Sequence, residues 1–207
     1  MLYLLYHEGP TTTGIFRRSA NAKTCRELKE RLNSGNSVQL EGESVFVAAS
    51  VITDFLRNIP GSVLSTGLYE KWMEVMAADD IEDKIELLSQ LPEDNVTLLR
   101  YLFALLYHIQ ESSQENQMNA LNLALCIAPN MLWLPVPTGP EEESQSTKKV
   151  DLLNVNSTFI PCWFNVISLK LNENNFDSTI VSSGFVFGTA FGIGIITFWN
   201  RHHHILE

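Results

Sequence analysis

The sequence predicts an all-α fold, on three observations. Up to about residue 153, apolar residues recur every three or four positions, as they do on the buried face of a helix. Gly, Pro and Asn separate these stretches, and none alternates with a period of two before residue 155. Hydrophobic residues make up 45% of the 207, which is enough to fill the core of one ordinary domain.

The first helix that the pattern predicts follows Ser19 or Asn21, since both are good N-cap residues. The run at 33–35 (Asn-Ser-Gly) supplies its stop, because Gly and Asn accept the backbone conformation that ends a helix. Its expected inner face consists of Cys25, Leu28 and Leu32.

Further helices are expected over about 45–57, 68–76, 81–88, 93–109 and 116–127. Pro60 ends the first of these, because proline cannot continue a helix. The segment 116–127 is apolar on most sides, which predicts a place at the centre of the core. The inner face expected for 45–57 consists of Val45, Ala49, Ile52 and Leu56.

The composition changes twice toward the end of the chain. Residues 134–146 are rich in Pro and acid, so we expect a solvated loop, and helical spacing stops after Leu153. We therefore expect a domain over 1–153 and a divergent tail over 154–207. The apolar segment 180–199 has no charge over a bilayer-spanning length, which is compatible with a membrane anchor but does not favour one. An altered chain end, disordered or prone to aggregate, is the alternative.

The charge and the motifs exclude several classes of function. A net charge of −10 argues against a general nucleic-acid binder, which needs a basic surface. A stand-alone enzyme is the least expected class, because there is no nucleotide-cradling glycine loop, no metal-ligand cluster and no acidic pair beside a nucleophile. We expect no cofactor and no metal. The three cysteines lack metal or disulfide spacing, which is typical of free thiols in the cytoplasm.

The segment 14–19 (Gly-Ile-Phe-Arg-Arg-Ser) is the strongest functional candidate. A glycine turn leads to Phe16, expected to tether the loop to the core, and then to Arg17 and Arg18 just before a helix. An arginine on such a stiff loop can meet a phosphate with two parallel hydrogen bonds. Taken alone, the segment is more typical of two solvated surface arginines.

Two more motifs follow this segment in order: FLRNIP at 55–60 and NLALCIAPNMLW at 122–133. Together the three motifs resemble the Rho GTPase-activating (RhoGAP) domain family, and the likeness covers residues 1–153. It implies a helical bundle that activates a GTP-bound Rho-family GTPase in signal transduction and makes no bonds itself. Arg17 falls at the position of the family's arginine finger, which neutralises charge that develops on the transferred phosphate.

The resemblance also implies a GTPase-binding face. Arg57 and Asn122 match family residues on that face, and Arg18 and Thr53 adjoin it. For Arg57 the alternative is a cation that pairs with carbonyls at the end of its own helix. For Asn122 the alternative is a bond to a neighbouring loop, since a buried amide without a partner costs about 1–3 kcal/mol.

The sequence departs from the family pattern at several points. Thr53 stands where the family usually has a lysine of the GTPase-binding face, so we expect weaker association with an acidic partner. Thr13 and Gln117 also replace frequent charged residues. The family's first helix begins upstream of Met1, and its last helix has no clean counterpart after Leu153. Two alternatives therefore stand beside the activator: a GTPase-binding module and a truncated product with little activity.

Overall fold

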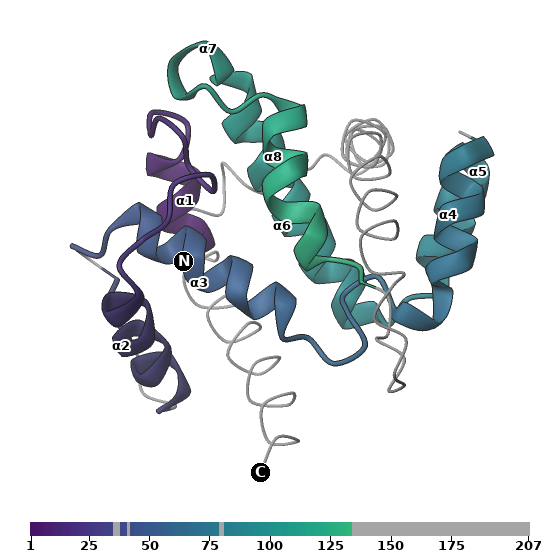
Figure 1. The fold of residues 1–207 in the computed structure, drawn as a ribbon, viewed down its shortest axis with the longest axis horizontal. Helices are drawn as coiled ribbons and strands as arrows, with labels where there is room; N and C mark the ends of the chain where they lie inside the picture. Colours follow the sequence, from purple (N-terminus) through teal and green to yellow (C-terminus); the bar gives the residue numbers. More distant parts are fainter. Residues whose placement is uncertain (35–37, 41, 79–80, 134–207) are drawn as a thin grey trace, which may run out of the picture.

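In the computed structural model, residues 1–34, 38–40, 42–78 and 81–133 are described, and within these ranges the chain forms helices and no strand (Figure 1). The all-α prediction is confirmed. The α-helices are α1 (Leu2–Glu8), α2 (Ala22–Asn33), α3 (Val45–Arg57), α4 (Tyr69–Ala78), α5 (Ile81–Ser89), α6 (Glu93–Glu111), α7 (Ser113–Asn116) and α8 (Ala120–Ile127). The 3₁₀ turns are η1 (Thr66–Leu68) and η2 (Ala128–Asn130).

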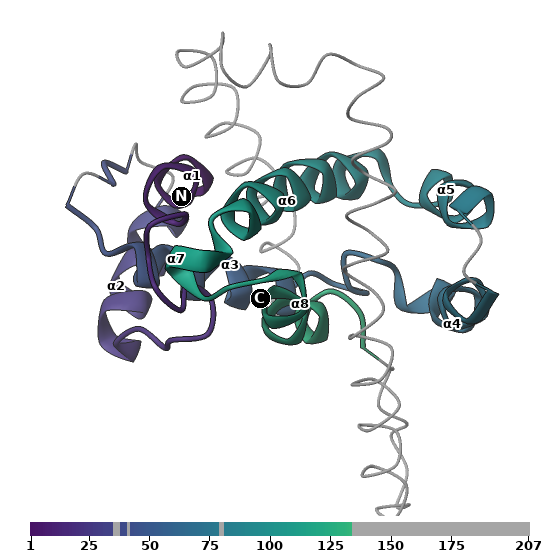
Figure 2. The same ribbon diagram turned by 90° about the horizontal axis from the view of Figure 1, so that it is seen from above.

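The helices are arranged along one long axis. In both views α3, α6 and α8 occupy the middle, with α1 and α2 toward one end and the paired α4 and α5 at the other (Figures 1 and 2). α1 packs on α3 and α6, and α2 packs on α3. The loop that joins α1 to α2 therefore runs along the outside of the central helices.

The core is formed mainly by α3 and α6. The inner face expected for α3 is confirmed, since Val45, Ala49, Ile52 and Leu56 are all buried. On α6, Leu99, Leu102, Phe103, Leu106 and Ile109 are buried as well. Burial of each such large side chain stabilises the fold by roughly 1.5–3 kcal/mol relative to exposure. The position of α3 is thus set by its own apolar face.

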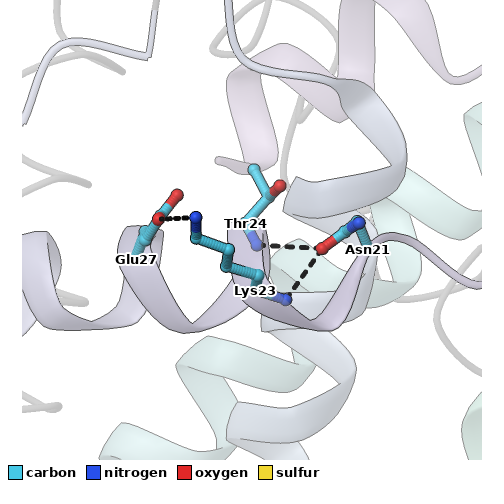
Figure 3. Close-up of polar contacts among 4 residues, drawn as sticks. All are labelled: Asn21, Lys23, Thr24 and Glu27. Carbon is cyan, nitrogen blue, oxygen red and sulfur yellow. Dashed lines mark hydrogen bonds and ion pairs between the residues drawn. The ribbon is translucent and has the colours of Figure 1, made fainter.

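Helix α2 begins at its cap as the sequence predicts. Of the two candidates, Asn21 is the cap: its side-chain oxygen accepts hydrogen bonds from the backbone N–H groups of Lys23 at 2.9 Å and Thr24 at 3.4 Å (Figure 3). Leu28 is buried against α3, whereas Cys25 and Leu32 are half-buried. Helix α2 thus makes a narrow apolar contact and leaves much of its polar surface free.

The prediction of one helix over 116–127 is wrong. Helix α7 ends at Asn116, Gln117 adopts a left-handed conformation with φ of 60°, and α8 begins only at Ala120 after its cap Asn119. The physical reason is that the Asn116 side chain accepts the backbone N–H of Met118 at 2.8 Å, a local bond that competes with the helix.

The expectation that this segment is wholly central also needs correction. Leu123, Ala124 and Ile127 are buried, but Leu121 and Leu125 of α8 are 44% and 43% exposed. These two leucines lie four residues apart, on one face of the helix. Helix α8 therefore has a buried face and an outward apolar face.

Several features expected from the sequence lie outside the described residues: the loop 134–146, Cys162, the tail 154–207 and its apolar segment 180–199. Among the helices of the described ranges, none is both long and apolar enough to cross a bilayer. Cys25 and Cys126 are free thiols, as expected, and they are half-buried.

Candidate functional site

The loop between α1 and α2 forms a tight turn that holds Arg17. Gly14 has a φ of 73°, in the left-handed region that glycine enters without strain. The Gly14 carbonyl accepts the backbone N–H groups of Arg17 at 3.0 Å and Arg18 at 2.9 Å. Both arginines therefore begin from a backbone that two hydrogen bonds close.

Ile15 is the main anchor of this turn, and Phe16 also packs against the core, as expected. Ile15 is fully buried in the core, while Phe16 is half-buried at its edge. Phe16 also has a φ of 65°, a conformation that costs a bulky side chain about 1–2 kcal/mol. Burial of Ile15 and the turn's hydrogen bonds offset that strain.

Asn116 fastens the turn to the rest of the domain, a role that sequence reasoning missed. Its amide donates to the carbonyls of Pro10 at 3.0 Å and Ile109 at 2.7 Å. Its own backbone carbonyl accepts the N–H of Gly14 at 2.8 Å. Asn116 is fully buried, so these bonds are shielded from water. The available signal was an amide residue beside a strongly apolar stretch, since buried amides need partners.

The two arginines have different surroundings. The guanidinium carbon of Arg18 lies 5.1 Å from the ring centroid of Phe46 on α3, within the range of a cation–π contact. The Arg17 side chain is exposed and has no hydrogen bond or ion pair within the described part of the chain. Arg17 is thus free to meet a partner, whereas Arg18 is held along α3.

Arg17 lies close enough to α8 to act on Cys126. Burial raises the pKa of the Cys126 thiol, and the positive charge of Arg17 opposes that rise. Arg17 thus lies within electrostatic range of the helix that also carries Asn122, although Arg17 and Cys126 are more than a hundred positions apart in the sequence.

Arg57 is bonded at the far end of α8. Its Nε donates to the side-chain oxygen of Asn130 at 2.9 Å, and the Asn130 amide donates to the carbonyl of Cys126 at 2.9 Å. Asn130 is buried, so this bridge ties the end of α3 to the end of α8. The expected alternative, a bond to carbonyls of its own helix, gives way to this side-chain partner.

Asn122 lies in the first turn of α8 and is half-buried. Its amide donates to the carbonyl of Gln117 at 3.0 Å, so the alternative of a bond to a neighbouring loop is what the structure shows. That bond uses one of the two amide hydrogens, and no described residue bonds the side-chain oxygen, so Asn122 keeps capacity for a further partner.

An open hollow of about 450 Å³ lies between α2, α3 and the loop that joins α1 to α2. It brings together Arg18, Thr53 and Arg57 of the predicted face, while Arg17 and Asn122 are not among its lining residues. The Thr53 hydroxyl donates to the carbonyl of Ala49 at 2.8 Å, within its own helix. Further lining residues are Arg26, Lys29 and Asp54. Among the described residues, no three His, Cys, Asp or Glu side chains are placed to hold a metal ion.

A comparison with protein families matches residues 1–136 to the RhoGAP domain. The chain belongs to the RhoGAP family. The resemblance inferred from the three sequence motifs is therefore confirmed.

Two curated relatives show which members it is similar to. Human Rho GTPase-activating protein 20 is 57% identical over 157 residues, which cover 74% of this chain and 13% of that protein. The human T-cell activation Rho GTPase-activating protein is 49% identical over 138 residues, 65% of this chain and 19% of that protein. The chain thus spans less than a fifth of either relative's length.

Among solved structures, the crystal structure of human Rho GTPase activating protein 15 aligns with a TM-score of 0.68. The alignment covers 80% of each chain at 20% sequence identity. At that identity the likeness shows the fold alone, and it supports a RhoGAP-like helical bundle.

Proposed function

We propose that this protein activates GTP hydrolysis by a Rho-family GTPase and that Arg17 is its arginine finger. The observation that carries the proposal is the exposed Arg17, which has no bonded partner among the described residues, on a turn that the buried Asn116 fastens to the core. Membership of the RhoGAP family supplies the class of partner.

The geometry suits an arginine that acts in another protein's active site. A rigid base lowers the entropy lost when the side chain is immobilised, and the lack of an internal partner leaves all its donors available. In the transition state, its charge would stabilise the phosphoryl oxygens and the leaving oxygen. An arginine supplied in this way accelerates hydrolysis by about 10³–10⁵-fold. The protein itself acts as an activator and not as an enzyme.

The remaining site residues have supporting roles in this proposal. Arg18 and Arg57 contact the GTPase through the hollow, and Asn122 meets it beside the finger. Thr53 adds contact area without charge. Its hydroxyl already donates to the carbonyl of Ala49, so it offers the GTPase little hydrogen bonding. The GTP-bound GTPase is the partner, since the finger stabilises a charge that develops only during hydrolysis.

The test is single-turnover GTP hydrolysis by a panel of Rho-family GTPases, with the 207-residue protein in catalytic amounts. Arg17→Ala is expected to abolish most of the acceleration while affinity for the GTP-bound form stays nearly unchanged, because the finger acts in the transition state. Lys23→Ala is the control, since this lysine is exposed on α2 and outside the hollow. Equal losses for Arg17→Ala and Arg18→Ala would refute the assignment of the finger.

Thr53 favours a second candidate, a module that binds a GTPase without activating it. Because Thr53 carries no charge, Arg57 is the one cation that α3 contributes to the lining of the hollow. Binding without acceleration, even after Thr53→Lys, would support the module. If the purified protein is soluble and melts cooperatively, the alternative of a truncated product with little activity is disfavoured.

We also propose that the helical domain ends near residue 153 and lies in the cytoplasm. The segment 180–199 is proposed to attach the chain to a membrane. Limited proteolysis that cuts first within 134–178 would support the boundary, and uniform resistance would contradict it. Carbonate extraction of a fluorescent fusion to 170–207 tests the anchor. Complete recovery in the soluble fraction would exclude it.

A further inference from the structure

Positive charge is concentrated around the hollow, in a chain that is acidic as a whole. The sequence carries a net charge of −10, yet the hollow is lined by four cations, Arg18, Arg26, Lys29 and Arg57. Asp54 is the one carboxylate among the lining residues. Four positive charges and one negative charge give a local net charge of +3. Such a patch attracts an acidic surface at a distance.

Asp54 is engaged by one of these cations. Its carboxylate accepts a hydrogen bond from the Lys29 ammonium at 2.8 Å, which links α3 to α2 across the hollow. The two side chains are 37% and 34% exposed, so solvent and a docked protein can reach both. An ion pair this exposed contributes little to stability, about 0–1 kcal/mol.

Two of the other cations of the hollow have uncharged partners. Arg57 is bonded to the amide oxygen of Asn130, and Arg18 lies on the ring of Phe46. Arg26 is exposed and has no hydrogen bond or ion pair in the described part of the chain. Of the four cations that line the hollow, Lys29 is therefore the one that is paired with an acidic residue of the same hollow.

We propose that the Lys29–Asp54 pair sets the rate and strength with which the acidic face of the GTPase docks: Lys29 attracts that face and Asp54 restrains it. This inference rests on the proposed function, because it takes the GTPase as the occupant of the hollow. The hollow continues through Phe16 and Arg18 into the loop that carries Arg17, so a protein that receives Arg17 covers the pair as well.

The occupant that fits is a protein surface and not a small anion. The hollow is open and bounded by two helices and a loop, which suits a broad contact. The Lys29 ammonium is already bonded to the Asp54 carboxylate, so a phosphate that bound beside Lys29 would be repelled by that carboxylate. A protein face can place its own carboxylates toward Arg18, Arg26 and Arg57 and stay clear of Asp54.

The proposal predicts opposite effects for the two partners of one ion pair. Lys29→Gln removes an attractive charge and leaves Asp54 exposed to an acidic partner, so association slows. Asp54→Asn removes the repulsive charge and frees Lys29, so association becomes faster. A purely structural ion pair would behave differently, because loss of either partner would weaken the same tie between α2 and α3.

The experiment measures association rates by stopped flow at low and high ionic strength. The probe is the GTPase of the panel that the 207-residue protein activates, loaded with a non-hydrolysable GTP analogue. We expect Lys29→Gln to lower the rate and Asp54→Asn to raise it, each by about twofold to fivefold at low salt, and both changes to shrink at high salt. Lys29→Arg keeps the charge and is expected to retain the wild-type rate.

The chain offers a matched control pair on the same helix. Lys23 and Glu27 form an ion pair at 3.8 Å on the solvent side of α2, with side chains 82% and 56% exposed, and neither lines the hollow (Figure 3). Lys23→Gln and Glu27→Gln change the total charge by the same amounts. They are expected to shift the association rate by less than half as much. Thermal melts of all variants show whether each one folds.

The outcomes separate this inference from the proposed function. If the wild-type protein activates a GTPase but the Lys29 and Asp54 variants shift the rate no more than the control pair does, this inference alone is overturned. If Lys29→Gln and Asp54→Asn both slow association, the pair is a structural tie and the inference is again wrong. If no GTPase in the panel binds, both the proposed function and this inference are refuted.

Discussion

Asn116→Ala tests whether the buried amide positions Arg17, the proposed arginine finger. The substitution leaves the Pro10 carbonyl without its donor and the Met118 N–H without its acceptor, while the Ile109 carbonyl keeps only the N–H of Ser112. A buried polar group without its partner costs about 1–3 kcal/mol, and carbonyls tolerate the loss better than N–H groups. We therefore expect a total loss of about 3 kcal/mol. For a chain of this size that corresponds to a melting temperature lower by about 6–12 °C.

The effect on activation is expected to exceed the effect on folding. Once the amide bonds are lost, the turn at Gly14 is held by fewer contacts, and Arg17 samples more positions. A misplacement of about 1 Å in a reacting site costs about a hundredfold in rate. Measured well below its melting temperature, the variant is expected to accelerate GTP hydrolysis about tenfold to hundredfold less than the wild type.

Asn95→Ala is the matched control for this prediction. Asn95 is also a buried asparagine, and its amide donates to the carbonyl of Val63 at 2.9 Å. It lies on α6, and its amide bond goes to Val63 and not to the loop that joins α1 to α2. We expect it to lower stability by about 1–2 kcal/mol and to leave activation unchanged. If both variants reduce activation in proportion to their loss of stability, Asn116 is a core residue without a positioning role.

Three further predictions follow from single positions. Gly14→Ala is expected to destabilise the fold by roughly 1–2 kcal/mol in thermal melts, because φ is 73° and a Cβ would lie 3.1 Å from side-chain carbons of Arg18; an unchanged melting temperature would contradict this. Thr53→Lys is expected to strengthen GTPase binding by up to about 1 kcal/mol at low salt, and equal Kd values would argue against the predicted face. Burial lowers the pKa of His108, so its stabilising effect is present above its unfolded pKa of about 6.5 and is lost as pH falls through the lower folded pKa; His108→Gln is expected to flatten the fall in melting temperature between pH 7.5 and 5.5, and parallel curves would contradict it.

The sequence predicted the elements whose signals are local. Helix α3 covers the range that its apolar spacing and the following Pro60 predict, and α2 starts at a cap that hydrogen-bonds within its own first turn. The family resemblance rested on three short motifs and was correct, because the order of motifs can be read from the sequence without knowing which residues are in contact. The boundary between α7 and α8 was not predicted, because the Asn116 side chain accepts the N–H of Met118 and interrupts the helix there. The Asn116 amide is held in that position by the carbonyls of the distant Pro10 and of Ile109.

By itself, then, the sequence determined the all-α class, most helix limits and the family, because periodicity, caps and motif spacing act over a few neighbouring residues. Only the tertiary structure decided which arginine is free: Arg17 and Arg18 are adjacent in sequence, and Phe46 on α3 distinguishes them. It also decided that Asn130 holds Arg57 and that Asp54 holds Lys29. These pairs join residues 73 and 25 positions apart, so they exist only once helix packing has fixed the distances between their side chains.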